Sequence, residues 1–479
     1  MSTPEQTKRL TIRSTKPKNN PTKTSNLTPL QLHNSQTPNP TMSTFQASPS
    51  KPPSTQPRII LHGGAGAITR SNLPPSLWGT HRTALLEILR SHSARLTQDP
   101  SATALEIATS AVTALENNPL FNSGRGAVFT REGTIELEAS VMVSKGMRKR
   151  GVGVMGVTRV RNPILLAREM LVRGEADDGG GAQGHCQLEG EVCERLAGEW
   201  GLELVSRGYF WTRKRWEEHR AGLGEDGFWA EAEYEMARST AGGRFESADC
   251  DEGLSISDDP SWNGSDYLPQ GTVGCVVLDR DGTLCVATST GGITNKLPGR
   301  IGDTPTLGAG FWAEEWAAPL PATDAIPFTP NPLAGFTSLL TSCLPFLTPY
   351  APYLLISHAD FTAAQYRSRR RAAAICGTGN GDSFLRLAAA RTASAIARFS
   401  SQTSLQTAVT AVAGPNGMLQ HSAGDRWLKS GEGEGGMIGI ELGEDGQGRV
   451  VADFNCGGMF RAWVDGDGEE RVRVFRGEY

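Results

Sequence analysis

The stretch from Gly271 to Gly292 constrains the fold of this chain more than any other part of its 479 residues. Apolar residues run from position 273 to 278 and resume at positions 284–287. Between them lies Asp-Arg-Asp-Gly (279–282), and an Asp-Gly pair between two apolar runs is typical of a tight turn. The pattern therefore predicts a β-hairpin, with Gly271-Thr272 directly before its first strand and Thr-Ser-Thr-Gly-Gly (288–292) closing its second.

Thr272 has the features of a nucleophile that is created by chain cleavage. A threonine hydroxyl needs a base to activate it, and an N-terminal α-amine, with a pKa of about 7.7–8.0, is able to serve as that base. Breaking the Gly271–Thr272 bond would give Thr272 such an amine. Glycine suits the preceding position, because a residue without Cβ tolerates strained backbone. We interpret Gly271-Thr272 as an autocleavage site, against the alternative that Thr272 is an ordinary strand residue.

Further motifs occur in a fixed order along the chain. They are Ile-Ile-Leu-His-Gly-Gly-Ala-Gly (59–66), Phe-Asn-Ser-Gly-Arg-Gly-Ala-Val-Phe (121–129), Arg-Asn-Pro (161–163), Thr-Asn-Lys-Leu-Pro-Gly-Arg-Ile-Gly-Asp (294–303), Gly-Thr-Gly-Asn-Gly-Asp (377–382) and Phe-Asn-Cys-Gly-Gly-Met (454–459). With Gly-Thr-Val-Gly (271–274), this set resembles the plant-type (type 2) asparaginase/isoaspartyl peptidase family, whose members are N-terminal nucleophile hydrolases. The resemblance covers most of residues 58–465, and the complete ordered set is far more specific than any single glycine motif.

The resemblance implies a fold and a reaction. The expected fold is α/β (α+β), a four-layer αββα sandwich with helices outside two stacked sheets. The expected enzyme matures by self-cleavage into an α chain (57–271) and a β chain (272–479). It would hydrolyse L-asparagine to L-aspartate and ammonia, or β-aspartyl (isoaspartyl) dipeptides, through an acyl-enzyme on Thr272.

The resemblance also assigns site residues. The catalytic set is Thr272, Thr290, Thr378 and Gly379, with the hydroxyl of Thr290 bonded to the nucleophile and Thr378 and Gly379 forming an oxyanion hole. The substrate-binding set is Asn122, Arg300, Asp303, Thr378, Gly379 and Gly381. A guanidinium suits the α-carboxylate of an amino acid and a carboxylate suits its α-ammonium. The alternatives are a surface salt bridge for Arg300 and Asp303 and a turn residue for Asn122.

Residues 115–125 resemble the family loop whose backbone carbonyls hold a structural sodium ion. The expected ligands are the carbonyl groups of Leu115, Glu116, Asn118, Phe121, Ser123 and Arg125. No organic cofactor is expected. Gly377-x-Gly379-x-Gly381 lacks the lysine of a phosphate-binding loop, so a nucleotide site is disfavoured. The family implies a dimer of αβ units.

Composition narrows the class of protein. With 38% apolar and 20% charged residues the chain has enough apolar content for a globular core. A net charge of −4 gives no reason to expect a nucleic-acid or membrane partner. Eight cysteines without a C-x-x-C pair favour reduced, buried thiols over zinc or a disulfide framework. No apolar run reaches the roughly 18 residues of a membrane span, and we expect a cytoplasmic protein.

Three regions depart from the compact family pattern. Residues 1–56 are rich in Ser, Thr, Pro and Asn, which predicts a disordered tail, with a targeting signal as the alternative. Residues 174–270 are a long region predicted to hold two helices and then a flexible linker to the cleavage site. Residues 315–370 form an insertion that ends in an arginine run (367–371), which we interpret as a solvated face. Two smaller departures are Glu138, where relatives commonly have Asp, and Val143-Ser144 in place of Asp-Gly.

Local patterns predict further elements. Helices are expected at residues 76–96, after an N-cap at Ser101, at 163–172 and at 381–399. Strands are expected at 59–61, 134–141 and 151–157, and a second hairpin at 437–442 and 450–454.

Other functions stay open at this point. A glycosylasparaginase-like amidase would share the nucleophile and the 377–382 loop, although residues 294–299 are closer to the asparaginase branch. A threonine aspartase is disfavoured by Asp303. A non-enzymatic scaffold on the same fold is the alternative from a different class, and the intact set of site residues argues against it.

Overall fold

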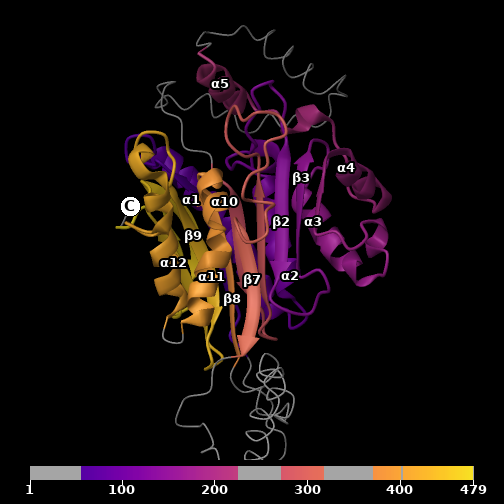
Figure 1. The fold of residues 1–479 in the computed structure, drawn as a ribbon, viewed down its shortest axis with the longest axis vertical. Coiled ribbons are helices and arrows are strands. Elements are labelled where there is room, and N and C mark those ends of the chain that lie inside the picture. Colours follow the sequence, from indigo (N-terminus) through magenta and orange to yellow (C-terminus); the bar gives the residue numbers. More distant parts are fainter. Residues whose placement is uncertain (1–54, 225–270, 318–369, 401–402, 478–479) are drawn as a thin grey trace, which may run out of the picture. The chain divides into compact units, whose positions relative to one another are not determined.

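The computed structural model describes residues 55–224, 271–317, 370–400 and 403–477. Its strands form two sheets (Figure 1). The larger sheet has eight strands, in the order β12 (Glu470–Arg473), β11 (Gly458–Val464), β1 (Arg58–Gly66), β5 (Val273–Leu278), β6 (Leu284–Thr290), β2 (Leu137–Val143), β3 (Gly151–Val157) and β4 (Gln187–Glu189). The smaller sheet has four, in the order β10 (Gly448–Phe454), β9 (Gly435–Leu442), β8 (Arg370–Gly379) and β7 (Phe311–Ala317). Every pairing is antiparallel except that of β3 with β4.

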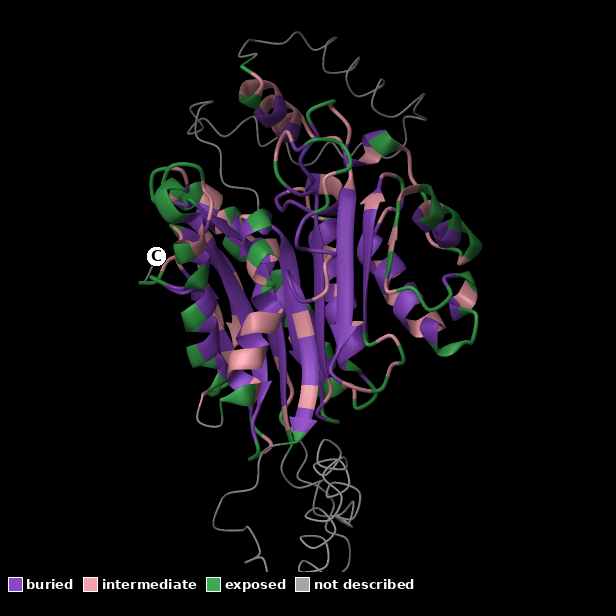
Figure 2. Cartoon of the chain, viewed as in Figure 1, coloured by how far each residue is buried: buried purple, intermediate pink, exposed green. Residues whose placement is uncertain are grey.

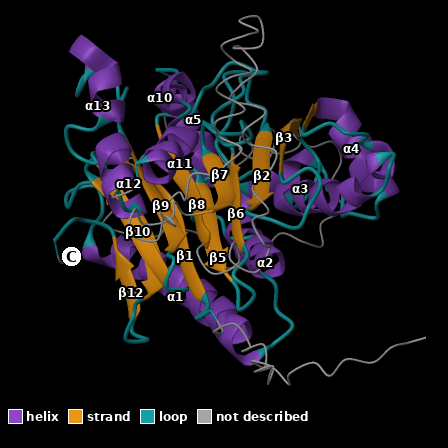
Figure 3. Ribbon diagram, turned by 60° about the horizontal axis from the view of Figure 1, so that its bottom comes forward, coloured by secondary structure: helices purple, strands orange, loops and turns teal. Residues whose placement is uncertain are grey.

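Helices cover the outer face of each sheet. The larger sheet packs against α1 (Pro75–Gln98), α2 (Ala104–Glu116), α3 (Pro163–Val172) and α4 (Gly190–Glu199). The smaller sheet packs against α11 (Ala389–Phe399) and α12 (Leu405–Ala413), which contact α10 (Gly381–Leu387) and α13 (Met418–Ala423). In Figure 3, α11 and α12 lie on one side of the strands, and α1 and α2 lie on the other.

Three separate apolar cores show how the layers are stacked. On β5, Cys275 and Val277 belong to the core under α1 and α2, whereas Val276 belongs to the core between the two sheets. On β8, Cys376 faces the core between the sheets, and Ile375 faces the core under α11 and α12. Three cores separate four layers, so the predicted αββα sandwich is confirmed. The inner strands are buried along nearly their whole length, whereas the edge strands β4 and β12 and the helices α1 and α4 have exposed residues (Figure 2).

The two-sided burial explains one feature that the alternating pattern did not predict. Ile135, Leu137, Ala139 and Val141 share one core, as expected from their spacing. All residues of β2 are nevertheless buried, because Met142 on the opposite face packs in the core between the sheets. A strand inside two stacked sheets has no solvent face.

Most local predictions agree with the structure. The hairpin has the expected strands, with Val273 paired with Ser289, and the strand at 151–157 and the helix at 163–172 have the expected bounds. Two predictions were wrong in detail. The N-cap of α2 is Thr103, which forms a capping box with Glu106, and not Ser101. The helix predicted at 381–399 is broken into α10 and α11 at Ala388, which has a φ of 45°.

The regions that depart from the family pattern are only partly described. Both helices predicted within residues 174–270 are present, as α4 and α5 (Arg213–Gly222). The tail to residue 54, the linker at 225–270 and residues 318–369 lie outside the described residues, as do Cys250 and Cys343. The six cysteines of the described part are free thiols. Within the same part, no helix combines the length and the apolar character that crossing a membrane requires.

Candidate active site

The predicted catalytic residues gather where three strands meet at one end of the sheets. Thr272 directly precedes β5, and Thr290 ends β6, the antiparallel neighbour of β5. Thr378 and Gly379 end β8, which packs on β5 and β6 from the other sheet. Segments that are about a hundred residues apart in the chain therefore supply one site, as the strand topology requires.

Gly271 occupies a space that no side chain fits. A Cβ atom at this position would lie 2.5 Å from Ala65 N, 2.5 Å from Thr378 Oγ1 and 2.7 Å from Gly64 Cα. The glycine turn after β1 and the end of β8 thus enclose the residue before the predicted cleavage point. The hydroxyl of Thr378 is buried and has no hydrogen-bond partner among the described residues. It remains available to a group that enters this space.

The hydroxyl of Thr272 is held by a residue that the sequence did not indicate. Thr272 Oγ1 lies 3.0 Å from Thr304 Oγ1, and both residues are buried. Thr304 is in turn fixed by its carbonyl oxygen, which accepts hydrogen bonds from Ser140 Oγ at 2.7 Å and from Thr288 Oγ1 at 3.4 Å. Ser140 and Thr288 also bond to each other at 2.6 Å. We refer to Thr272, Thr304, Ser140 and Thr288 as the hydroxyl network.

Thr290 and Asn122 lie beside the nucleophile, with other partners than those predicted. The β5–β6 register places Thr290 one step beyond the Val273–Ser289 pair, opposite Thr272. Its hydroxyl accepts the N–H of Gly292 at 3.0 Å, whereas the hydroxyl partner of Thr272 is Thr304. The Asn122 amide donates to Gly292 O at 2.7 Å, and its oxygen accepts Val128 N at 3.1 Å. The loop at 291–292 is therefore fixed by both side chains.

His62 on β1 is an uncharged neighbour of the nucleophile. The ring is fully buried, and neither ring nitrogen has a hydrogen bond of standard geometry within the described residues. Burial lowers the pKa of His62 to about 3, although the backbone of Thr272 favours the charged form. At neutral pH the ring contributes shape rather than charge to this part of the site.

A second group of side chains brings charge next to the nucleophile. Asp303 directly precedes Thr304, and Arg300 lies three residues earlier in the same loop. A Cβ atom at Gly381 would lie 2.5 Å from Asp303 Oδ1 and 3.0 Å from Arg300 Nη2, so both side chains border one space at the start of α10. The sequence predicted this meeting of Arg300, Asp303 and Gly381.

Glu138 joins this group from β2. Its Oε1 accepts the N–H of Gly302 at 2.9 Å, and its Oε2 has no partner among the described residues. Asp303 Oδ2 is buried and unpartnered in the same way. Arg300 contacts Asp382 at 3.2 Å, and the Asp382 side chain is about half exposed. An exposed pair of this kind is worth little, so Arg300 is free to exchange Asp382 for another carboxylate.

Burial shifts the ionisation of these groups. The pKa of Asp303 is raised to about 7, first by burial and then by the charge of Glu138, against the attraction of Arg300. Burial also raises the pKa of Glu138 and lowers that of Lys296, whose ammonium donates to Glu136 O at 2.9 Å. We refer to Arg300, Asp303, Glu138 and Lys296 as the charged cluster. Two unpaired carboxylate oxygens beside two cations form a site that suits a ligand with both an anionic and a cationic end.

The loop after α2 has the oxygen groups that a hard cation prefers. A Cβ at Gly126 would lie 2.1 Å from Phe121 O, and one at Gly124 would lie 2.4 Å from Glu116 O. Glycine at both positions therefore lets two of the predicted ligand carbonyls lie against the loop backbone, and Phe121 O also accepts the N–H of Ser123 at 2.9 Å. The remaining predicted ligands, Leu115, Asn118, Ser123 and Arg125, lie in the same segment. The described part of the chain has no cluster of three acidic, His or Cys side chains for a metal.

The buried guanidinium of Arg215 forms hydrogen bonds to this loop. Arg215 on α5 donates from Nε to Gly126 O at 2.7 Å and from Nη2 to Leu120 O at 3.4 Å. Its Nη1 pairs with Glu218 at 2.8 Å, and the side chains of both residues are buried. The helix α5 therefore holds the loop that carries Asn122. Sequence patterns gave no sign of this contact, because Arg215 reads as one charge on a polar helix.

This chain is similar in sequence to known proteins of one family. A family model described as asparaginase matches residues 55–324, which is more than half of the chain. This chain belongs to the asparaginase family. It is 40% identical to an isoaspartyl peptidase of Salmonella typhimurium over 255 residues, which cover 53% of this chain and 69% of that protein. Over 421 residues it is 30% identical to the probable isoaspartyl peptidase/L-asparaginase 2 of Arabidopsis thaliana, covering 87% and 98%.

A third relative is the plant-type L-asparaginase of Pyrococcus furiosus, 32% identical over 259 residues, with coverage of 54% of this chain and 71% of that protein.

Sequence reasoning missed some residues of the site in this chain. They are the hydroxyl network around Thr304 and the ammonium of Lys296. One signal was present. Thr304 directly follows Asp303, so a loop that places the carboxylate in the site also places that hydroxyl there.

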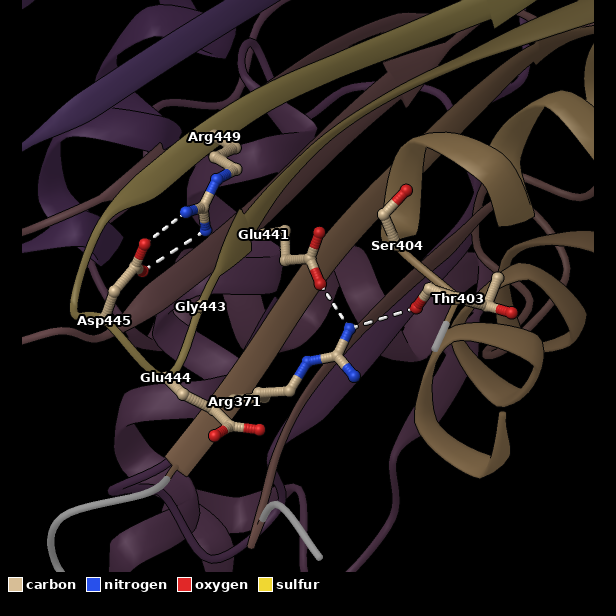
Figure 4. Close-up of a pocket in the computed structure, with 8 residues that line it drawn as sticks. All are labelled: Arg371, Thr403, Ser404, Glu441, Gly443, Glu444, Asp445 and Arg449. Carbon is tan, nitrogen blue, oxygen red and sulfur yellow. Dashed lines mark hydrogen bonds and ion pairs between the residues drawn. The ribbon is translucent and has the colours of Figure 1, made fainter. Parts of the chain in front are cut away.

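A separate surface pocket lies at the opposite end of β8. It has a volume of about 410 Å³ and is lined by Arg371, Thr403, Ser404, Glu441, Gly443, Glu444, Asp445 and Arg449 (Figure 4). Both arginines are paired, Arg371 with Glu441 and Arg449 with Asp445. The pocket shares no residue with the site at Thr272, and its arginine charges are already compensated. The pocket is therefore separate from the charged cluster.

Proposed function

We propose that this protein is a threonine amidohydrolase that cuts itself between Gly271 and Thr272 and then hydrolyses the side-chain amide of L-asparagine or the β-linkage of isoaspartyl dipeptides. The observation that carries the proposal is that two adjacent residues, Asp303 and Thr304, reach the two parts of the site. Thr304 contacts the nucleophile at 3.0 Å, and Asp303, one residue earlier, supplies a buried carboxylate with an unpaired oxygen. One loop thus links the reacting hydroxyl to a site for an amino acid.

In maturation, Thr272 Oγ attacks the carbonyl carbon of Gly271. The C–N bond to Thr272 breaks, the hydroxyl proton passes to the departing nitrogen, and an ester remains between Gly271 and Thr272 Oγ. Water then hydrolyses the ester, returns a proton to Oγ and leaves a free α-amine on Thr272. The close enclosure of Gly271 by Gly64, Ala65 and Thr378 supports this step, because it fixes the carbonyl next to the nucleophile.

In turnover, the new α-amine takes the proton of Thr272 Oγ as that oxygen attacks the substrate amide. Arg300 binds the α-carboxylate of the substrate, and Asp303 binds its α-ammonium. The unpartnered Thr378 hydroxyl and the backbone of Gly379 stabilise the developing oxyanion. Ammonia or an amine leaves, and water releases aspartate from the acyl-enzyme.

A substrate panel tests this proposal. The matured protein is assayed with L-asparagine, a β-aspartyl dipeptide and glycosylasparagine, beside the Thr272→Ala variant. We expect release of aspartate from at least one of the first two, and none from the variant. Preference for glycosylasparagine would move the protein to the related amidase function. Cleavage without hydrolysis of any of the three would favour a scaffold.

Three further properties are proposed, and the first two of them rest on the family resemblance. We propose that the carbonyl groups of residues 115–125 hold a sodium ion with a purely structural role, which fixes the loop that carries Asn122. A higher melting temperature in sodium chloride than in choline chloride of equal concentration would support it. We also propose a dimer of αβ units, testable by light scattering, and a cytoplasmic location.

A further inference from the structure

We propose that Thr304 is a catalytic residue, whose hydroxyl orients the oxygen of Thr272 for self-cleavage and then supports it in turnover. The inference deepens the proposed function and rests on it. Its basis is geometric, because Thr304 Oγ1 is the hydrogen-bond partner of the reacting oxygen, at 3.0 Å. Neither Thr290 nor His62 forms a hydrogen bond with that oxygen in the described part of the structure.

The position of Thr304 is fixed by contacts that have no other evident purpose. Ser140 on β2 donates to Thr304 O at 2.7 Å, and Thr288 on β6 donates to Ser140 Oγ at 2.6 Å. Ser140 and Thr288 are fully buried, and Thr304 is 1% exposed. These buried hydroxyls hold the backbone carbonyl of Thr304. Its side-chain hydroxyl is therefore directed toward Thr272 Oγ1. A buried hydroxyl that lost this arrangement would have to find another partner.

The uncut chain needs such a group more than the mature enzyme does. Before cleavage the nitrogen of Thr272 is part of a peptide bond, so it is not available as a base. Thr304 accepts the hydroxyl proton of Thr272 in a hydrogen bond, which leaves the lone pairs of Thr272 Oγ free to face the Gly271 carbonyl. Thr304 transfers no proton itself. In the attack, the hydroxyl proton of Thr272 leaves this hydrogen bond as the C–O bond forms, and it passes from Oγ to the departing nitrogen, as maturation requires.

After cleavage the same hydrogen bond reverses its direction. The proton of Thr272 Oγ then faces the free α-amine, and Thr304 donates its own hydroxyl proton to Oγ. A donor on the nucleophile stabilises negative charge as the oxygen is deprotonated. Thr304 therefore acts on the reacting oxygen in both reactions and makes no contact with the substrate. Its loss is expected to lower kcat and leave KM for asparagine unchanged.

The test compares Thr304→Val with Thr304→Ser. Valine keeps the branched shape and removes the hydroxyl, whereas serine keeps the hydroxyl and removes the methyl group. Intact-mass measurements over time give the cleavage rate of each full-length chain. We expect Thr304→Val to cleave about fivefold more slowly, the effect of one hydrogen bond of roughly 1 kcal/mol, and Thr304→Ser to cleave within about twofold of wild type. A wild-type rate for the valine variant, or an equally slow serine variant, would overturn the proposal.

Thr288→Val is the control for packing within the hydroxyl network. It removes a contact to Thr304 O without touching Thr272, so it should slow cleavage less than Thr304→Val does. An equal or larger effect would show that network packing, and not the Thr304 hydroxyl, sets the rate. If the valine variant does not fold, the serine variant still decides, because it must mature and turn over normally. A wild type that cleaves but hydrolyses neither asparagine nor a β-aspartyl dipeptide would refute the proposed function. The cleavage rates would then still test the role of Thr304 in maturation.

Discussion

The hydroxyl network and the charged cluster lie side by side and differ in one respect. Every hydroxyl of the network has a partner, from Thr272 to Thr304 and on to Ser140 and Thr288. Among the described residues, the charged cluster has buried oxygens without partners, on Asp303 and Glu138. Since an unpaired buried polar atom is costly, the first group is complete as it stands and the second is complete only with a ligand.

This difference assigns a task to each region. A network that is satisfied in the uncut chain is prepared for a reaction within the chain, so it serves maturation. A cluster with open acceptors beside cations is prepared for an external amino acid, so it serves substrate binding. The two tasks should be separable by mutation, with cleavage reporting on one region and KM on the other.

The largest expected effect is on cleavage alone. Gly271→Val should slow cleavage by at least about 100-fold, because a Cβ here would lie 2.5 Å from both Ala65 N and Thr378 Oγ1. The measurement is the fraction of cut chain over time by intact mass. Gly184→Val is the matched control, since a Cβ at Gly184 meets no atom within 4 Å. Normal cleavage of Gly271→Val would show that the scissile bond is not held as described.

The next effect is on substrate binding. Asp303→Asn should lower kcat/KM for asparagine by roughly 10- to 100-fold, the value of a hydrogen bond to a charged group, while cleavage continues. Succinamic acid, which is asparagine without its α-amino group, should be hydrolysed equally by wild type and variant. Equal losses on both substrates would mean that Asp303 does not bind the ammonium.

A smaller effect is expected from filling the space at α10. In Gly381→Ala the new methyl group would lie 2.5 Å from Asp303 Oδ1 and 3.0 Å from Arg300 Nη2. These are side-chain atoms that are able to shift, so we expect folding and cleavage to persist and KM for asparagine to rise about tenfold, or roughly 1.4 kcal/mol. Steady-state kinetics measures the change, with Gly184→Ala as control. A slower cleavage reaction with an unchanged KM of the matured enzyme would reverse the assignment of the two regions.

The smallest effect is a shift in pH dependence. Because the pKa of Asp303 is about 7 in the free protein, its carboxyl is protonated below that pH and cannot pair with the substrate ammonium. We expect kcat/KM for asparagine to fall as pH drops below about 7, more steeply than for succinamic acid, which reports on the Thr272 amine alone. Glu138→Gln removes a negative neighbour and should move the fall to lower pH.

The same shift affects stability with a defined sign. Between the ordinary pKa of 3.8 and about 7, folded Asp303 binds more protons than unfolded Asp303, so its contribution to the free energy of unfolding decreases as pH rises through this window. The kinetic test has a clear contrary outcome. If the pH dependence of kcat/KM for asparagine were the same in Glu138→Gln as in wild type, the carboxyl groups of Asp303 and Glu138 would not interact.

The sequence predicted those parts of the site that depend on local pattern and on ordered motifs. Thr272 at the start of a hairpin follows from the apolar alternation, and the four-layer fold and the placement of Arg300 and Asp303 beside one space follow from the resemblance. The contacts of Thr304 and Arg215 did not follow, because each depends on which strand or helix packs against a loop. The break at Ala388 was missed for a similar reason, since alanine favours a helix and only the surrounding fold imposes its positive φ.

The most direct test of the account is the intact mass of the purified wild-type chain beside Thr272→Ala. The account predicts two fragments in the wild type whose masses meet at the Gly271–Thr272 bond, and a single uncut chain in the variant. An uncut wild-type chain under conditions that favour maturation, or cleavage that persists in the variant, would contradict it.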